Sequence, residues 1–158
     1  MAPANRFALT QLLTYPIIGT ILGRFHNFYT YQYVLNQLFG ERKLTIAEMH
    51  DLWHVARFND GFRVFGHLLN YLDERKTYEQ RWVNALKATS IPLQFIYGPA
   101  DPINQRQVFI DYYLQNIPNP RLDVLGDRVG HYPNLEDPIG VVKLMIEFLN
   151  QHNYSYKL

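Results

Sequence analysis

The stretch Leu93-Gln94-Phe95-Ile96-Tyr97-Gly98-Pro99-Ala100-Asp101-Pro102 decides the fold, because an apolar run ends there in a glycine-proline loop that carries an acid. Farther along, a short run from Leu122 to Leu125 precedes Gly130-His131-Tyr132-Pro133-Asn134-Leu135-Glu136. Both patterns predict a strand that ends in an irregular loop. Parallel strands end at one rim of their sheet, where each can place one polar side chain. Asp101 and His131 are therefore expected to lie side by side.

The chemistry expected of Asp101 and His131 is that of an acid and a base acting together. A carboxylate beside an imidazole fixes its tautomer and stabilises the imidazolium that forms when the ring takes a proton. Taken singly, Asp101 has a structural interpretation as a turn residue before Pro102, and His131 has one as a loop histidine beside Gly130. Such strings are short and frequent. Their occurrence together, each after a strand, favours the catalytic interpretation.

Local signals predict the helices. Thr45 and Glu48 have the spacing of a capping box, and Thr77-Tyr78-Glu79-Gln80 is a second box. Between them one face of a helix from Gly61 to Arg75 should be buried, because apolar residues recur there at helical spacing: Phe62, Phe65, Leu68, Leu69 and Leu72. A helix from Ile103 to Asn116 should join the two strands. Asp137-Pro138, a cap and a first-turn proline, predicts the last helix, which carries Val142, Met145, Ile146 and Leu149.

The predicted order is a run of helices to about Lys87, a hinge near 88–92, and then strand, helix, strand and helix. Two strands joined by a helix run parallel, so the fold class is α/β. The edges of such a sheet require further strands, which this sequence does not supply.

Several stretches of the chain together resemble one family. They are Leu52-Trp53, Phe58-Asn59-Asp60-Gly61, Arg81-Trp82-Val83-Asn84-Ala85-Leu86, Ile96 to Asn104, and His131 to Pro138. From about Thr10 onward they resemble the lid and C-terminal part of the mesoderm-specific transcript family of α/β-hydrolases, itself similar to epoxide hydrolases and haloalkane dehalogenases. The resemblance implies that residues 1–88 form a helical lid. Residues 89–158 would then form the C-terminal part of the α/β-hydrolase core, the last βαβα of a parallel sheet.

The resemblance also implies roles for the two polar residues. Asp101 would be the acid of a catalytic triad, and His131 the base that activates water to release an ester intermediate. The family forms that ester on a strand-to-helix elbow, with an aspartate in the epoxide-hydrolase branch, and no elbow exists here. Serine occurs only at Ser90 and Ser155, and cysteine does not occur. The parent protein is expected to hydrolyse a small apolar epoxide, ester or related substrate, whereas this chain alone is expected to be inactive.

Other side chains allow a functional and a structural interpretation. Epoxide hydrolases use lid tyrosines as hydrogen-bond donors, but the packing interpretation is favoured over this role for each candidate here: Tyr29, Tyr31, Tyr33, Tyr71 and Tyr78. Trp53 and Trp82 are candidates for a pocket lining or for the core. The histidines at 50, 54 and 67 suggest a metal only weakly, because no third ligand has the right spacing, so neither metal nor cofactor is expected. Glu136 is expected to anchor the histidine loop rather than to titrate in catalysis.

Composition narrows the function classes. With 47% hydrophobic and 18% charged residues, the chain is expected to be globular. A net charge of +1 without a basic stripe gives no case for nucleic acid, and zero cysteines exclude a disulfide framework and thiolate chemistry. The apolar segment Phe7 to Arg24 is interrupted by polar residues, proline and glycine, so neither a spanning helix nor a signal peptide is expected. In the family comparison it falls in the lid, with contact to a membrane surface as the alternative.

A second class of function stays open. A chain of 158 residues suits one domain, whereas an α/β-hydrolase with a lid needs roughly twice that size. The sequence is therefore expected to be a truncated unit, whether a short product, a splice form or an incomplete gene model. Half a sheet exposes unpaired backbone, so the alternative is a non-catalytic binding or regulatory module that forms homo-oligomers through the sheet edge or binds a membrane. The resemblance favours the endoplasmic reticulum membrane, with the cytoplasm as the alternative.

Overall fold

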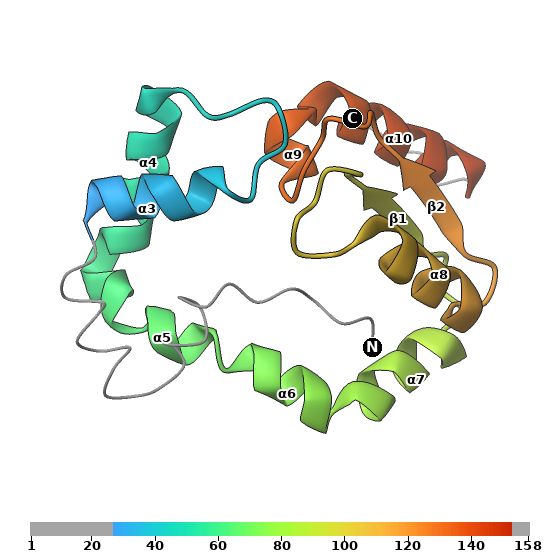
Figure 1. The fold of residues 1–158 in the computed structure, drawn as a ribbon. Coiled ribbons are helices and arrows are strands. Elements are labelled where there is room, and N and C mark those ends of the chain that lie inside the picture. The colour runs from blue at the N-terminus through green and yellow to red at the C-terminus, as the bar shows by residue number, and fades with distance from the viewer. Residues whose placement is uncertain (1–26, 153–158) are drawn as a thin grey trace.

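The computed structural model describes residues 27–152, so the apolar segment Phe7–Arg24 and Ser155 lie outside the described residues. Helices come first, followed by strand, helix, strand and helix, which confirms the predicted order. Figure 1 shows the N-terminal helices in an arc that leads from α3 to α7 and returns the chain to the strands. The elements are α3 (Phe28–Asn36), α4 (Ile46–Arg57), the 3-10 helix η1 (Phe58–Arg63), α5 (Phe65–Leu68), α6 (Tyr71–Thr77), α7 (Glu79–Ala88), β1 (Gln94–Tyr97), α8 (Arg106–Asn116), β2 (Arg121–Val124), α9 (Pro133–Glu136) and α10 (Pro138–Gln151).

The sheet contains two parallel strands within the described part of the chain. Gln94 of β1 pairs with Arg121 of β2, and Tyr97 pairs with Val124. The sequence predicts strands from Leu93 to Tyr97 and from Leu122 to Leu125, so β1 begins one residue later than predicted and β2 lies one residue earlier. The molecule is thus mostly helical around a small parallel sheet, as expected for the α/β class.

Alternate residues of β1 face two different helices, because side chains of a strand alternate between the two faces of the sheet. Phe95 packs on α8, with its ring centroid 5.1 Å from that of Phe109 and 5.2 Å from that of Tyr113. On the other face the Gln94 amide donates hydrogen bonds to the Leu144 carbonyl of α10, at 3.0 Å, and to the Asp123 carboxylate, at 2.8 Å. β1 therefore lies between α8 and α10, which fixes the loop after it.

The helices α3 and α4 both begin at a capping box. The predicted box at α4 is confirmed: the Thr45 N–H donates to the Glu48 carboxylate at 2.8 Å, and the Glu48 N–H donates to the Thr45 hydroxyl at 3.2 Å. The box at α3 is formed by Asn27 and Thr30. The two helices then pack through aromatic and sulfur-containing side chains, and Met49 is fully buried.

Two helix predictions are wrong. The second capping box does not form, because the Thr77 hydroxyl donates to the Asp73 carbonyl, and the N-cap residue of α7 is Tyr78, which makes no side-chain capping bond. The predicted helix from Gly61 to Arg75 is divided among η1, α5 and α6, and Leu68 is 63% exposed instead of buried. The side chains of Phe62 and Phe65 lie outside the described part of the structure.

The core of the described residues is small. The buried apolar side chains in the range 27–152 are Phe39, Met49, Trp53, Val83, Tyr97 and Ile117. The outer face of α10 is apolar and exposed, from Ile139, 82% exposed, to Ile146, 52% exposed. That helix carries apolar residues both toward the sheet and toward solvent.

Candidate functional site

The ends of β1 and β2 bring Asp101 and His131 into contact. The Asp101 Oδ2 and His131 Nδ1 atoms are 2.9 Å apart, although the two residues are 30 positions apart in the sequence. The Asp101 side chain is only 7% exposed and that of His131 30% exposed. This contact holds Nδ1 of the ring and leaves Nε2 as the nitrogen that can exchange a proton with a substrate or water.

The loop after β1 locks the Asp101 carboxylate. Its Oδ1 atom accepts hydrogen bonds from the N–H groups of Ile103, at 2.8 Å, and Asn104, at 3.2 Å, and its Oδ2 atom accepts one from the Asn104 amide at 2.8 Å. Burial raises the pKa of Asp101, but the hydrogen bonds from His131, Asn104 and Ile103 outweigh it, so the net pKa is lowered. The carboxylate is therefore ionised and oriented toward the imidazole at neutral pH.

Backbone hydrogen bonds hold the histidine loop on both sides. The His131 N–H donates to the Leu38 carbonyl at 3.0 Å, and the Ala100 N–H donates to the Val129 carbonyl at 2.8 Å. The first bond ties the loop to the segment that joins α3 to α4, and the second ties it to the loop of Asp101. The position of His131 thus depends on three separate parts of the chain.

Three glycines allow these segments to approach closely. A Cβ atom added at Gly98 would overlap the Gly130 carbonyl oxygen, and one added at Gly130 would overlap the Gly40 nitrogen. At Gly40 it would overlap the carbonyl oxygen of Arg128. Glycine is required at each point because another backbone occupies the space of a side chain. We call this contact of Gly40, Gly98 and Gly130 the glycine junction.

Glu136 anchors the histidine loop, which confirms the anchoring interpretation. Its side chain is buried, with the residue 6% exposed, and its Oε2 atom accepts hydrogen bonds from the N–H groups of Gly40 and Gly130, both at 2.8 Å. Its Oε1 atom accepts one from the Tyr132 N–H at 3.2 Å. Gly40 and Asn104 belong to the site but were not predicted from the sequence. Only Asn104 had a local signal, since it follows Asp101 at the spacing of a side-chain turn.

The five candidate tyrosines differ in their exposure and in their neighbours. Tyr29 and Tyr33 are 78% and 68% exposed, whereas Tyr31 is half-buried, and burial raises its pKa. Burial also raises the pKa of Tyr132, next to His131, and nearby Tyr31, Tyr71 and Asp101 add to this rise. Tyr31 and Tyr71 are therefore the candidates that approach the histidine loop. Tyr78 instead packs on Trp82, with ring centroids 5.9 Å apart.

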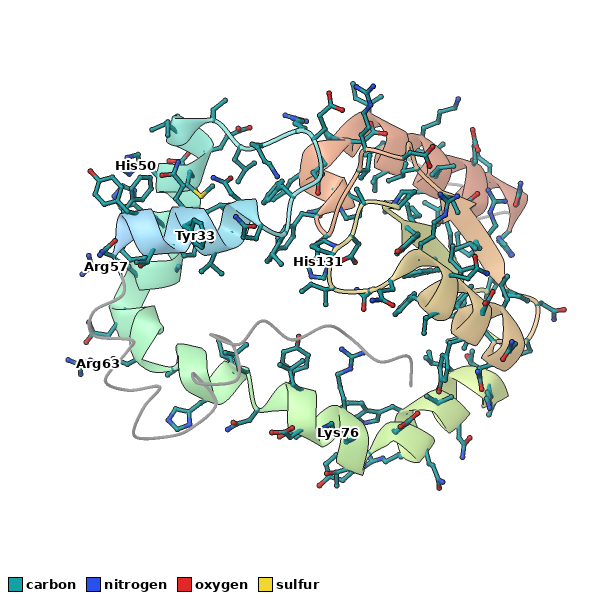
Figure 2. The ribbon with its side chains drawn as sticks, viewed as in Figure 1. Tyr33, His50, Arg57, Arg63, Lys76 and His131 are labelled. Atoms are coloured by element: carbon teal, nitrogen blue, oxygen red, sulfur yellow. The ribbon has the colours of Figure 1, made fainter. Side chains whose placement is uncertain are left out.

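The other candidates lie away from this site. Figure 2 shows His131 facing the N-terminal helices, while His50, Arg57 and Arg63 lie along α4 and η1. His50 is exposed and stacks on Phe28, with ring centroids 3.9 Å apart. His54 is also exposed, and within residues 27–152 no three metal-ligating side chains gather. Of the two tryptophans, Trp53 is in the core and Trp82 is partly exposed.

Known proteins similar to this chain include three mesoderm-specific transcript proteins. The mouse protein is 41% identical over 135 residues, and its bovine and human homologues are 38% identical over the same length. A weaker similarity, 31% over 106 residues, links the chain to LipZ of Mycobacterium tuberculosis, a protein whose name marks it as a candidate hydrolase. No family model matches the chain, and no solved structure matches it significantly.

The matches cover a large share of this chain but a smaller share of each relative. They take up 85% of this chain but only 40% of each mesoderm-specific transcript protein. For LipZ the shares are 67% of this chain and 36% of that protein. The chain thus spans about two fifths of the length of these relatives. Within the described residues, no helix is both long and apolar enough to cross a membrane.

Proposed function

The chain is homologous over most of its length to the mesoderm-specific transcript proteins, and on that premise we propose that it supplies the acid and base of an α/β-hydrolase site. The observation that supports this is the 2.9 Å contact between Asp101 and His131, made by a carboxylate with further donors on both oxygens. The nucleophile comes from polypeptide beyond this sequence.

In this proposal the two residues act in the second half of a two-step reaction. A carboxylate nucleophile opens the ring of a small apolar epoxide, whose oxygen takes up a proton, or a hydroxyl nucleophile displaces the alcohol of an ester; either step leaves an ester on the enzyme. His131 then takes a proton from a water molecule that attacks this ester, and cleavage of the ester releases the product and restores the nucleophile. Asp101 stabilises the resulting imidazolium, because its carboxylate is ionised and already bonded to Nδ1. The 30% exposure of the His131 side chain leaves room for that water.

The proposal also assigns a role to each part of the fold. β1 to α10 form the C-terminal part of the hydrolase core, and α3 to α7 form its lid, with Tyr31 and Tyr71 placed to meet the substrate. Both tyrosines lie close enough to Tyr132 to raise its pKa. The endoplasmic reticulum membrane is the proposed location of the parent protein.

The test uses a hybrid in which this chain replaces the matching stretch of the mouse relative. The hybrid and the mouse protein are assayed with a panel of epoxides and esters, followed by intact mass spectrometry. A His131→Ala hybrid should lose about 10²- to 10⁴-fold in turnover and retain a covalent adduct. His67→Ala, an exposed histidine on α5, is the matched control. An unchanged rate in the His131→Ala hybrid would show that the assignment is wrong.

A second candidate function is a non-catalytic binding module, and the exposed outer face of α10 favours it. Ile139, Val142, Met145 and Ile146 share that face, and each is at least 47% exposed. Such a patch on a soluble protein commonly marks an interaction site. Sedimentation of the purified chain at increasing concentration tests this function. A soluble monomer at all concentrations, with a sharp unfolding transition, would count against it.

A further inference from the structure

Glu136 is a buried acid that the proposed chemistry does not use. It accepts three backbone hydrogen bonds, from Gly130 and Tyr132 on either side of His131 and from Gly40, which is 96 positions away. It makes no hydrogen bond to the imidazole of His131. Any influence on that ring must therefore act through the backbone.

We propose that Glu136 is a positioning residue for His131, holding the histidine loop against the segment 38–41. Its catalytic consequence rests on the proposed function, but the positioning itself does not. Two of the three peptide N–H groups that donate to Glu136, those of Gly130 and Tyr132, lie on either side of His131 in the sequence. The His131 N–H donates to Leu38, in the same segment as Gly40. The backbone of His131 is thereby fixed on three sides.

A carboxylate suits this position better than any other side chain. Three N–H donors converge on the two oxygens, and a carboxylate has about four acceptor positions and no donor of its own. An amide would turn an NH₂ group toward at least one of these donors. A buried donor left without an acceptor is costly, so the site favours a side chain whose oxygens only accept hydrogen bonds.

The arrangement also couples two parts of the molecule. The segment 38–41 follows α3, whose Tyr31 approaches the histidine loop, and the Glu41 N–H donates to the Arg128 carbonyl at 2.9 Å. The segment after α3 lies directly against the histidine loop, because the glycine junction leaves no space between the backbones. The positioning residue therefore makes the alignment of His131 dependent on the N-terminal helices.

The test compares Glu136→Gln with Glu41→Gln in the full chain. Glu41 pairs with Arg128 at 2.7 Å, so it also joins the two segments, but its side chain is 60% exposed. The readouts are amide hydrogen exchange and the ¹⁵N shifts of the His131 ring, which report its tautomer. Glu136→Gln should speed exchange at Gly40, Gly130 and His131 by about tenfold or more and mix the ring tautomers, while β1 keeps its protection. Glu41→Gln should leave both readouts unchanged.

Three outcomes would overturn the proposal: unchanged exchange and tautomer in Glu136→Gln, an equal rise at β1, or fast exchange at Gly40 and Gly130 in the unmodified chain. If Glu136→Gln does not fold, Gly40→Ala is the variant that tests the proposal. Its added Cβ forces the segment 38–41 away from the histidine loop and keeps the Glu136 carboxylate. A fixed tautomer in folded Gly40→Ala would also overturn the proposal. The role of Asp101 is tested separately. If the His131 ring of the unmodified chain shows no fixed tautomer, the assignment of Asp101 as the acid of the pair is wrong.

Discussion

Asp101 accepts four hydrogen bonds, and the most direct consequence at the scale of one residue is a response to acid. Its pKa in the folded chain is lowered below the unfolded value of about 3.9. A lowered pKa adds stability that is fully present above the unfolded value and is lost as the pH falls through the folded value. The site should therefore weaken below about pH 4.

We expect Asp101→Asn to lower the free energy of unfolding by about 1–3 kcal/mol at pH 7, because one acceptor oxygen is lost in a buried site. The difference between the variant and the unmodified chain should shrink as the pH falls below about 4, where Asp101 becomes protonated. Urea unfolding of both proteins at pH 7 and pH 3 measures this. An equal difference at the two pH values would contradict the lowered pKa.

The glycine junction gives a second prediction for single residues. Gly98→Ala should destabilise the chain by about 1–3 kcal/mol or more, because its Cβ would overlap the Gly130 carbonyl oxygen. Gly126→Ala is the matched control, since nothing lies within 4 Å of its added Cβ, and a change within about 1 kcal/mol is expected. Thermal unfolding of the two variants compares them. Similar losses would show that the junction is not closely packed in solution.

The contact between Asp101 and His131 could be predicted because each residue follows a strand, and parallel strands end at the same rim of their sheet. The residues that hold the pair in place were harder to foresee. Gly40 meets Gly130 only because the segment after α3 folds back onto the histidine loop. A contact over this distance in sequence leaves no local pattern, whereas Glu136 stands close enough to His131 to be interpreted as an anchor.

At the scale of the element, helix starts were predictable where the capping bonds are local. We expect Thr45→Ala to cost about 0.5–2 kcal/mol, because it removes the hydroxyl that accepts from the Glu48 N–H. Thr77→Ala should change stability by less than about 0.5 kcal/mol, since that hydroxyl only donates to the Asp73 carbonyl. Urea unfolding, with hydrogen exchange over the first turn of α4, measures both. A larger loss in Thr77→Ala would contradict the assignment of the caps.

The helix predicted from Gly61 to Arg75 failed for a reason outside its own periodicity. Asn59 and Asp60, just before it, have left-handed backbones, with φ of 51° and 59°. The chain turns there, and the following residues divide into η1, α5 and α6 rather than continuing α4. Apolar spacing predicts an apolar face but does not show whether another element covers it. Leu68 lies on the predicted face and is exposed.

At the scale of the whole molecule, stability should come from few side chains. Met49→Ala, which empties the one fully buried large side chain within 27–152, should cost about 2–5 kcal/mol. Ile139→Ser, at a site that is 82% exposed, should change stability by less than about 0.5 kcal/mol. Chemical unfolding curves measure the contrast. A large loss in Ile139→Ser would mean that the outer face of α10 is covered in solution.

The glycine junction has a consequence for how this protein can change over generations. Every codon change that replaces glycine at 40, 98 or 130 adds a side chain where another backbone already lies. A change at any one of the three positions is costly by itself, and its relief requires a shift in a segment encoded far away. The three glycines should therefore be retained together. In a gene-shuffling library, surviving recombinants should keep all three glycines, whichever parent supplies each segment.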